Sequence, residues 1–163
     1  MAKLSSTTVF GDLFVTGNIS NAAPFSARLT STQPDAENGV DVDIFDAVDI
    51  SSSAITRDSS KQITFDVSGT FEISWMVNFH RTGSGARNIM YSEVEKNGSR
   101  LSSRTRVADY IRTSGNGDEC STGSTVILQI QSGDTLRIFA NEERGGETGN
   151  DIERAVIYIK RIE

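Results

Sequence analysis

The sequence predicts an all-β sandwich, and three observations support this prediction. The 163-residue chain is only 36% hydrophobic and contains 14 glycines, together with many Ser and Thr residues, which are weak helix formers. Residues 63–79 alternate between apolar and polar side chains with a period of two, which is typical of a strand with one buried face. Turn residues separate the other short apolar runs, and no stretch of ten or more residues shows a helical stripe.

The N-terminal residues 1–24 predict an attachment segment. Gly11-Asp12 and Gly17-Asn18 are typical of turns, and an apolar strand-like stretch lies between and around them. An isolated strand of this length is marginal in water, so we expect it to pack on sister copies or on a partner. The candidate attachment residues are Phe10, Leu13, Phe14, Val15 and Ile19. Residues 25–39 are polar, contain Pro34 and predict a lead-in linker, and residues 40–163 predict the folded domain.

Turn signals divide the folded domain into strands. Gly69 predicts a bend between strands at 63–67 and 71–79. Asn97-Gly98 predicts a hairpin, because both residues tolerate positive φ, and Ser132-Gly133-Asp134 predicts a second turn. The chain ends in a β-branched and aromatic strand at 154–162.

Two strands, at 126–128 and 156–159, carry apolar side chains on both faces. A strand of a lone sandwich needs only one apolar face, so with no helices to cover the second face we expect a subunit interface there. The candidate interface residues are Ile127, Leu128, Val156 and Tyr158.

A basic run at 100–112 is the most distinctive charged feature. Its arginines all occupy even positions and would share one face of a continuous strand with Tyr110, while Leu101, Val107 and Ile111 would face inward. Two interpretations stay open for them. They pair with Asp and Glu of the same or a neighbouring subunit, or they contact an acidic protein surface or an anionic glycan. The four residues are Arg100, Arg104, Arg106 and Arg112.

The sequence indicates no enzyme and no cofactor. His80 is the only histidine, and the acidic neighbours of Cys120 would raise the pKa of this lone thiol and make it a poor nucleophile. A single cysteine also forms no intrachain disulfide. The acidic residues Asp41, Asp43, Asp46 and Asp49 fit a solvated edge better than a metal site, although calcium binding near Asp41 and Asp43 stays open.

Composition also limits the expected partners. A net charge of −6 argues against duplex nucleic acid as a partner, because such proteins need a broad basic face. No window reaches the roughly 18 consecutive apolar residues of a membrane span, and residues 1–20 lack the apolar stretch of a signal peptide. We therefore expect a soluble protein that is made in a reducing cytoplasm and binds neither nucleic acid nor a membrane.

Several of these segments together resemble the tumour necrosis factor and complement globular-head superfamily. The resemblance rests on the early strand at 44–48, the Gly-aromatic motif at 67–75, the midpoint hairpin at 94–98 and the Gly-Asp motif at 128–136. It spans roughly residues 40–163. It implies a jelly-roll β-sandwich and a homotrimer.

Residues 11–19, read as Gly-Asp-Leu-x-Val-x-Gly-Asn, resemble a repeat unit of tailed-bacteriophage fibre proteins. Together the two resemblances imply a virion structural protein, assembled in the host cytoplasm. Our first interpretation is a trimeric capsid decoration (cement) protein, held by its N-terminal segment to the major capsid protein or another virion protein. The alternatives are a short head or tail fibre that binds a host surface receptor, and a soluble ligand-binding head.

Overall fold

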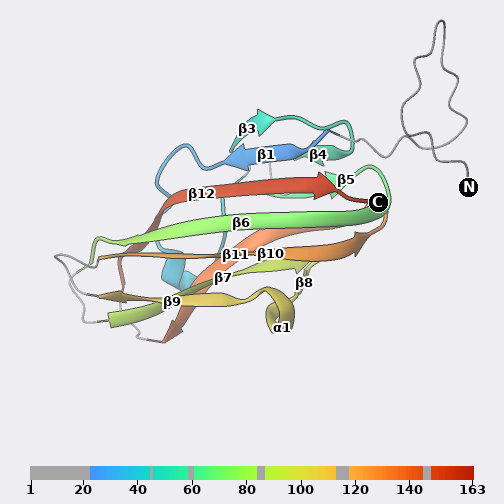
Figure 1. Ribbon diagram of the computed structural model, residues 1–163. Coiled ribbons are helices and arrows are strands. Elements are labelled where there is room, and N and C mark those ends of the chain that lie inside the picture. The colour runs from blue at the N-terminus through green and yellow to red at the C-terminus, as the bar shows by residue number, and fades with distance from the viewer. Residues whose placement is uncertain (1–22, 45, 59–60, 84–86, 113–117, 145–147) are drawn as a thin grey trace, which may run out of the picture.

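The computed structural model describes residues 23–44, 46–58, 61–83, 87–112, 118–144 and 148–163. Two antiparallel sheets face each other and enclose the core (Figure 1), so the predicted all-β sandwich is confirmed. The five-stranded sheet has the order β3 (Ala47–Ile50), β1 (Phe25–Arg28), β12 (Asn150–Arg161), β6 (Gly69–Arg81) and β10 (Glu119–Ile130).

The seven-stranded sheet has the order β4 (Ile55–Arg57), β5 (Ile63–Phe65), β11 (Thr135–Arg144), β7 (Arg87–Lys96) and β8 (Ser99–Arg100). In addition, β2 (Val40–Asp41) pairs with β11, and β9 (Val107–Arg112) pairs with β7. The two helical segments of the described chain, η1 (Ala36–Asn38) and α1 (Ser102–Thr105), are both too short and too polar to cross a lipid bilayer.

The core lies between the sheets and is built from alternate residues of each strand. Ile73, Trp75 and Val77 of β6 are almost fully buried, as are Met90 and Val94 of β7 in the opposite sheet. The apolar positions of the period-two pattern at 63–79 are therefore those that face the core, as predicted.

Gly69 is the first residue of β6, where the chain crosses from β5 in one sheet to β6 in the other. A Cβ atom at this position would come within 2.4 Å of the backbone oxygen of Glu163, so a glycine lets the C-terminal residue pack against the crossing. The predicted bend is confirmed.

Both predicted turns are present. Asn97 and Gly98 have φ values of 52° and 74°, and they close the hairpin between β7 and β8. Residues 132–134 connect β10 to β11, which belong to different sheets, so this turn is a crossover between the layers.

The lead-in linker predicted at 25–39 is wrong, because this stretch belongs to the sandwich. β1 pairs with β12 on one side and β3 on the other, and Phe25 and Ala27 are buried. The buried Gln33 then ties the chain down: its side chain donates to the backbone oxygen of Asp41 and accepts from the backbone N–H of Asp43. The folded body thus begins at β1.

The strand pairings locate the two ends of the sandwich. At one end, the start of β1 lies beside the end of β12, with Phe25 opposite Ile159. We call this the terminal end, since the C-terminus lies there too (Figure 1). At the other end, which we call the loop end, Arg81 lies opposite Asn150 and Arg87 opposite Arg112.

Candidate functional site

The outer face of the five-stranded sheet, which points away from the core, carries an apolar band. Met76 lies directly opposite Val156, and Tyr158 lies opposite Ser74. Of eight large apolar side chains that are exposed in the described part of the chain, five lie on the outer face of this sheet: Ile50, Met76, Ile127, Val156 and Tyr158. Val48 of the edge strand β3 is also exposed, but it lies opposite the buried Ala27 and therefore on the core side. Soluble proteins rarely leave such a patch uncovered, and patches of this kind mark protein interfaces.

A depression of about 240 Å³ lies within this band. Ser26 and Ser74 are small, so they leave a hollow between the larger side chains of Met76, Val156 and Tyr158. An apolar side chain from a second molecule would fill this hollow and cover the larger side chains around it.

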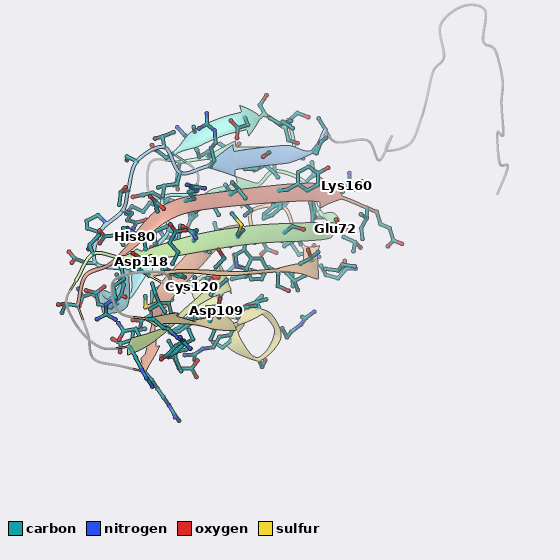
Figure 2. All side chains as sticks on the ribbon, turned by 60° about the vertical axis from the view of Figure 1, so that its left-hand side comes forward. Glu72, His80, Asp109, Asp118, Cys120 and Lys160 are labelled. Atoms are coloured by element: carbon teal, nitrogen blue, oxygen red, sulfur yellow. The ribbon has the colours of Figure 1, made fainter. Side chains whose placement is uncertain are left out.

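Charged residues bound the apolar band at its two ends (Figure 2). Toward the terminal end, Glu72 of β6 lies directly opposite Lys160 of β12. Toward the loop end, His80 Nε2 lies 3.7 Å from Asp118 Oδ2, and both side chains are about one-third exposed. The band is therefore apolar at its centre and charged at its margins, which is the usual anatomy of a protein interface.

Three of the four residues predicted for a subunit interface lie on this face, namely Ile127, Val156 and Tyr158. Leu128 does not. It is 4% exposed and lies opposite the buried Phe71, so its side chain belongs to the core, and its assignment to an interface is corrected. Sequence reasoning missed Met76, although it is the one large apolar residue among the polar positions of the 63–79 alternation.

The outer face of the seven-stranded sheet carries arginines stacked on aromatic rings. The guanidinium carbon of Arg100 lies 3.5 Å from the ring centre of Phe139, and that of Arg106 lies 3.7 Å from the ring centre of Tyr91. Beneath Arg100, the buried carboxylate of Glu93 lies 3.7 Å from the arginine Nε. Arg106 also reaches Glu143, at 4.0 Å. Of the two interpretations offered for the basic run, Arg100 and Arg106 therefore follow the one in which arginines pair with acidic residues of the same chain.

The continuous strand expected at 100–112 does not form, because α1 interrupts it. The Thr105 hydroxyl accepts a hydrogen bond from the Val94 backbone and donates one to the Leu101 carbonyl, which holds the chain in a helical turn. Arg104 lies in this turn and donates to the backbone oxygen of Ile127, so it does not join the predicted basic face. Arg112 lies on β9, 5.9 Å from the ring of Tyr110.

Cys120 lies in an environment that disfavours its thiolate form. Burial, together with the nearby Asp109 carboxylate, raises the pKa of the Cys120 thiol to about 12 (Figure 2). The predicted direction of this pKa shift is confirmed. Its main cause is burial, however, and the acidic contribution comes from β9 instead of from the sequence neighbours of Cys120.

The acidic residues at 41–49 are engaged by basic ones. Asp41 pairs with Arg137 at 2.5 Å, Asp43 with Lys61 at 3.0 Å, and Asp49 with Arg28 at 2.9 Å. Asp46 accepts a hydrogen bond from the Thr30 hydroxyl. Within the described ranges, no three His, Cys, Asp or Glu side chains gather in a group that could hold a metal ion.

The predicted attachment residues Phe10, Leu13, Phe14, Val15 and Ile19 lie outside the described residues. The chain enters the described part at residue 23, just before β1, and therefore joins the sandwich at its terminal end.

Solved structures of two animal proteins are similar to this chain. The globular domain of the zebrafish complement 1qA protein matches with a TM-score of 0.52 and 16% identity, over 86% of this chain and 97% of that one. Murine APRIL matches with a TM-score of 0.53 and 13% identity, over 85% of this chain and 99% of that one. The fold is a jelly roll of the tumour necrosis factor and complement head type. At these identities the likeness establishes the fold alone.

The jelly roll implied by the sequence resemblance is thereby confirmed. No protein-family model matches the sequence, and no curated protein matches it either.

Proposed function

We propose that this chain is a non-enzymatic head that assembles as a homotrimer through the outer face of its five-stranded sheet. The observation that carries the proposal is the apolar band on that face, with its hollow between Met76 and Tyr158. Burying a large apolar side chain contributes about 1.5–3 kcal/mol, so covering several of them in each subunit favours assembly strongly. The resemblance to the tumour necrosis factor and complement heads supports a ring of three copies as the form of this assembly.

Light scattering during size-exclusion chromatography tests the proposal. The expected mass is three times 17.7 kDa, about 53 kDa, at micromolar concentration. Tyr158→Asp should shift the protein to the monomer, because it places a charge in the interface. Tyr110→Asp is the matched control, since Tyr110 is 39% exposed against 38% for Tyr158 but lies on the other sheet. A monomeric wild-type chain, or a Tyr158→Asp trimer as stable as the control, would refute the proposal.

The arrangement of the ends supports a role in display. The described chain starts and finishes at the terminal end, so a head held there exposes its loop end to a partner. The absence of enzymatic activity is part of the proposal and is supported by the raised pKa of the Cys120 thiol, which makes it a poor nucleophile. We expect the head to bind a receptor or ligand by contact alone.

A second proposal concerns what holds the head. The resemblance of residues 11–19 to a phage-fibre repeat supports attachment to a virion, with residues 1–24 binding the major capsid protein or another virion protein. Strand addition by the apolar segment would satisfy its backbone groups and bury Phe10 or Phe14. In this proposal the protein decorates the capsid, and a short head or tail fibre is the nearest alternative.

Deleting residues 1–20 separates the two proposals. The truncated chain should keep the trimer mass but lose binding to purified particles that lack this protein, measured by co-sedimentation. Truncated protein that decorates particles as well as the full chain does would refute attachment by the N-terminal segment. Full-length protein that binds host cells but no capsid would instead indicate a fibre.

A further inference from the structure

Three arginines from adjacent strands converge on the outer face of the seven-stranded sheet at its loop end. Arg87 of β7 lies directly opposite Arg112 of β9. Arg144 of β11 lies opposite Ile89, two residues along β7 from Arg87. Side chains directly opposite each other in an antiparallel pair are about 5 Å apart at Cβ, and diagonal ones about 7–8 Å. We call Arg87, Arg112 and Arg144 the loop-end arginine cluster.

Nothing in the described part of the chain neutralises this cluster. The ion pairs on this face go to other arginines: Glu93 to Arg100, Glu143 to Arg106 and Asp41 to Arg137. No ion pair between described residues involves a member of the loop-end arginine cluster. The neighbouring sequence at 84–86, 113–117 and 145–147 contains a single ionisable residue, Glu147.

A chain with a net charge of −6 therefore concentrates positive charge at one place. Like charges directly opposite each other destabilise an antiparallel pair, so the native fold gains when an anion lies between them. Guanidinium groups bind carboxylates through two parallel hydrogen bonds, which gives both strength and fixed geometry. This chemistry identifies the ligand group as a carboxylate or a similar anion.

An exposed aromatic ring lies beside the cluster. Tyr110 lies opposite Ile89 on the same face and is 39% exposed, with the Arg112 guanidinium carbon 5.9 Å from its ring centre. The ring and the half-buried Ile89 are cross-strand neighbours on this face, and they offer apolar surface beside the arginines on which the C–H face of a sugar can lie. An Asp or Glu side chain of a protein partner supplies the carboxylate but has no ring to cover this apolar surface.

We propose that the loop-end arginine cluster, together with Tyr110, binds an acidic sugar residue of a glycan, with its carboxylate on the arginines and its ring on Tyr110. The inference deepens the proposed function and rests on it for orientation, since a head held at its terminal end presents this face outward. Binding itself uses one chain. Three copies in a trimer would add avidity.

The test uses the full chain and immobilised oligosaccharides of matched length, terminated by a sialic or uronic acid, by a sulfated sugar, or by a neutral sugar. Polyglutamate is the acidic-polypeptide probe. We expect tight binding to the carboxylated probes, weakened by salt because the contact is between charges. Arg87→Gln and Arg112→Gln should each weaken it about tenfold or more. Tyr110→Ala should also weaken it, through loss of this apolar surface.

Arg104→Gln is the matched control, because it removes the same charge from α1, where Arg104 instead contacts the Ile127 carbonyl. It should bind as the wild type does. The melting temperature of Arg112→Gln should not fall, since the substitution relieves repulsion, and this excludes misfolding as the cause of lost binding.

Three results would overturn the inference. They are wild-type affinity in Arg112→Gln, tighter binding to polyglutamate than to the carboxylated glycans, and no binding to any carboxylated probe. Light scattering on the same samples reports the trimer separately. A wild-type trimer that binds no carboxylated glycan overturns the sugar site alone. A wild-type monomer that binds the glycan overturns the trimer alone.

Discussion

The hydroxyl of Ser92 joins the two sheets inside the core. It accepts hydrogen bonds from Trp75 Nε1 at 3.0 Å and from the Thr122 hydroxyl at 2.7 Å, and Ser92 itself is fully buried. Ser92→Ala leaves both donors without this acceptor. Each unsatisfied buried donor costs about 1–3 kcal/mol, so the free energy of unfolding should fall by about 2 kcal/mol or more in urea titrations. Ser99→Ala, at an exposed position of β8, should change it little.

The carboxylate of Asp134 makes the turn after β10 sensitive to acid. Burial alone would raise its pKa, but hydrogen bonds from the Asn97 side chain and the Gln131 backbone, together with Lys96, lower the pKa to about 2. A carboxyl with a lowered pKa in the folded state stabilises the protein above its unfolded pKa, and this contribution is lost as pH falls toward 2. Wild type should therefore melt above Asp134→Asn at pH 7. The gap should shrink between pH 4 and pH 2, and a gap independent of pH would contradict this origin.

Strands β6 and β10 approach each other so closely at Gly123 that only a glycine fits. A Cβ atom there would lie 2.2 Å from the backbone oxygen of Trp75 and 2.9 Å from Cα of Met76. Backbone atoms cannot move aside as a flexible side chain can, so Gly123→Ala should push the strands apart. Overpacking typically costs about 1–3 kcal/mol, and we expect a loss at the upper end, measured by thermal unfolding. Thr125→Ala, two residues along β10 on the same face, removes only an exposed hydrogen bond to Ser74 and should lower the melting temperature much less.

Long alternating strands were predictable from sequence, whereas short and distant pairings were not. The 63–79 pattern identified β6 because one face of a strand meets the core. β1 was missed because its four residues, Phe-Ser-Ala-Arg, are too few for their alternation to be recognised, and because they pair with residues 156–159, far along the chain. The continuous strand predicted for the basic run at 100–112 was wrong for a different reason. Its even spacing of arginines persists through α1, and the helical turn is defined by backbone hydrogen bonds at 101–106 and by those of the Thr105 hydroxyl, which the spacing does not reveal.

The candidate surfaces depend on strand register, which limits what sequence can predict. Apolar runs at 126–128 and 156–159 indicated an outer apolar face, but a three-residue run does not say which residues point inward. Pairing with β6 decides that Ile127 is outside and Leu128 inside. The loop-end arginine cluster was not predicted, because Arg87, Arg112 and Arg144 meet only once β9, β7 and β11 are aligned.

Assembly and folding of the whole molecule should be linked, because the apolar band is exposed in a single chain. A partner subunit that binds only the folded state stabilises that state, and the stabilisation increases with protein concentration. Hundredfold dilution should therefore lower the melting temperature of the wild type, whereas Tyr158→Asp should melt lower and independently of concentration. Reducing agent should change neither, since Cys120 is the only cysteine. Equilibration for days before each scan removes slow dissociation as an explanation. A wild-type melting temperature that still does not depend on concentration would show that the sandwich is stable without its sister copies, and would contradict the link between assembly and folding.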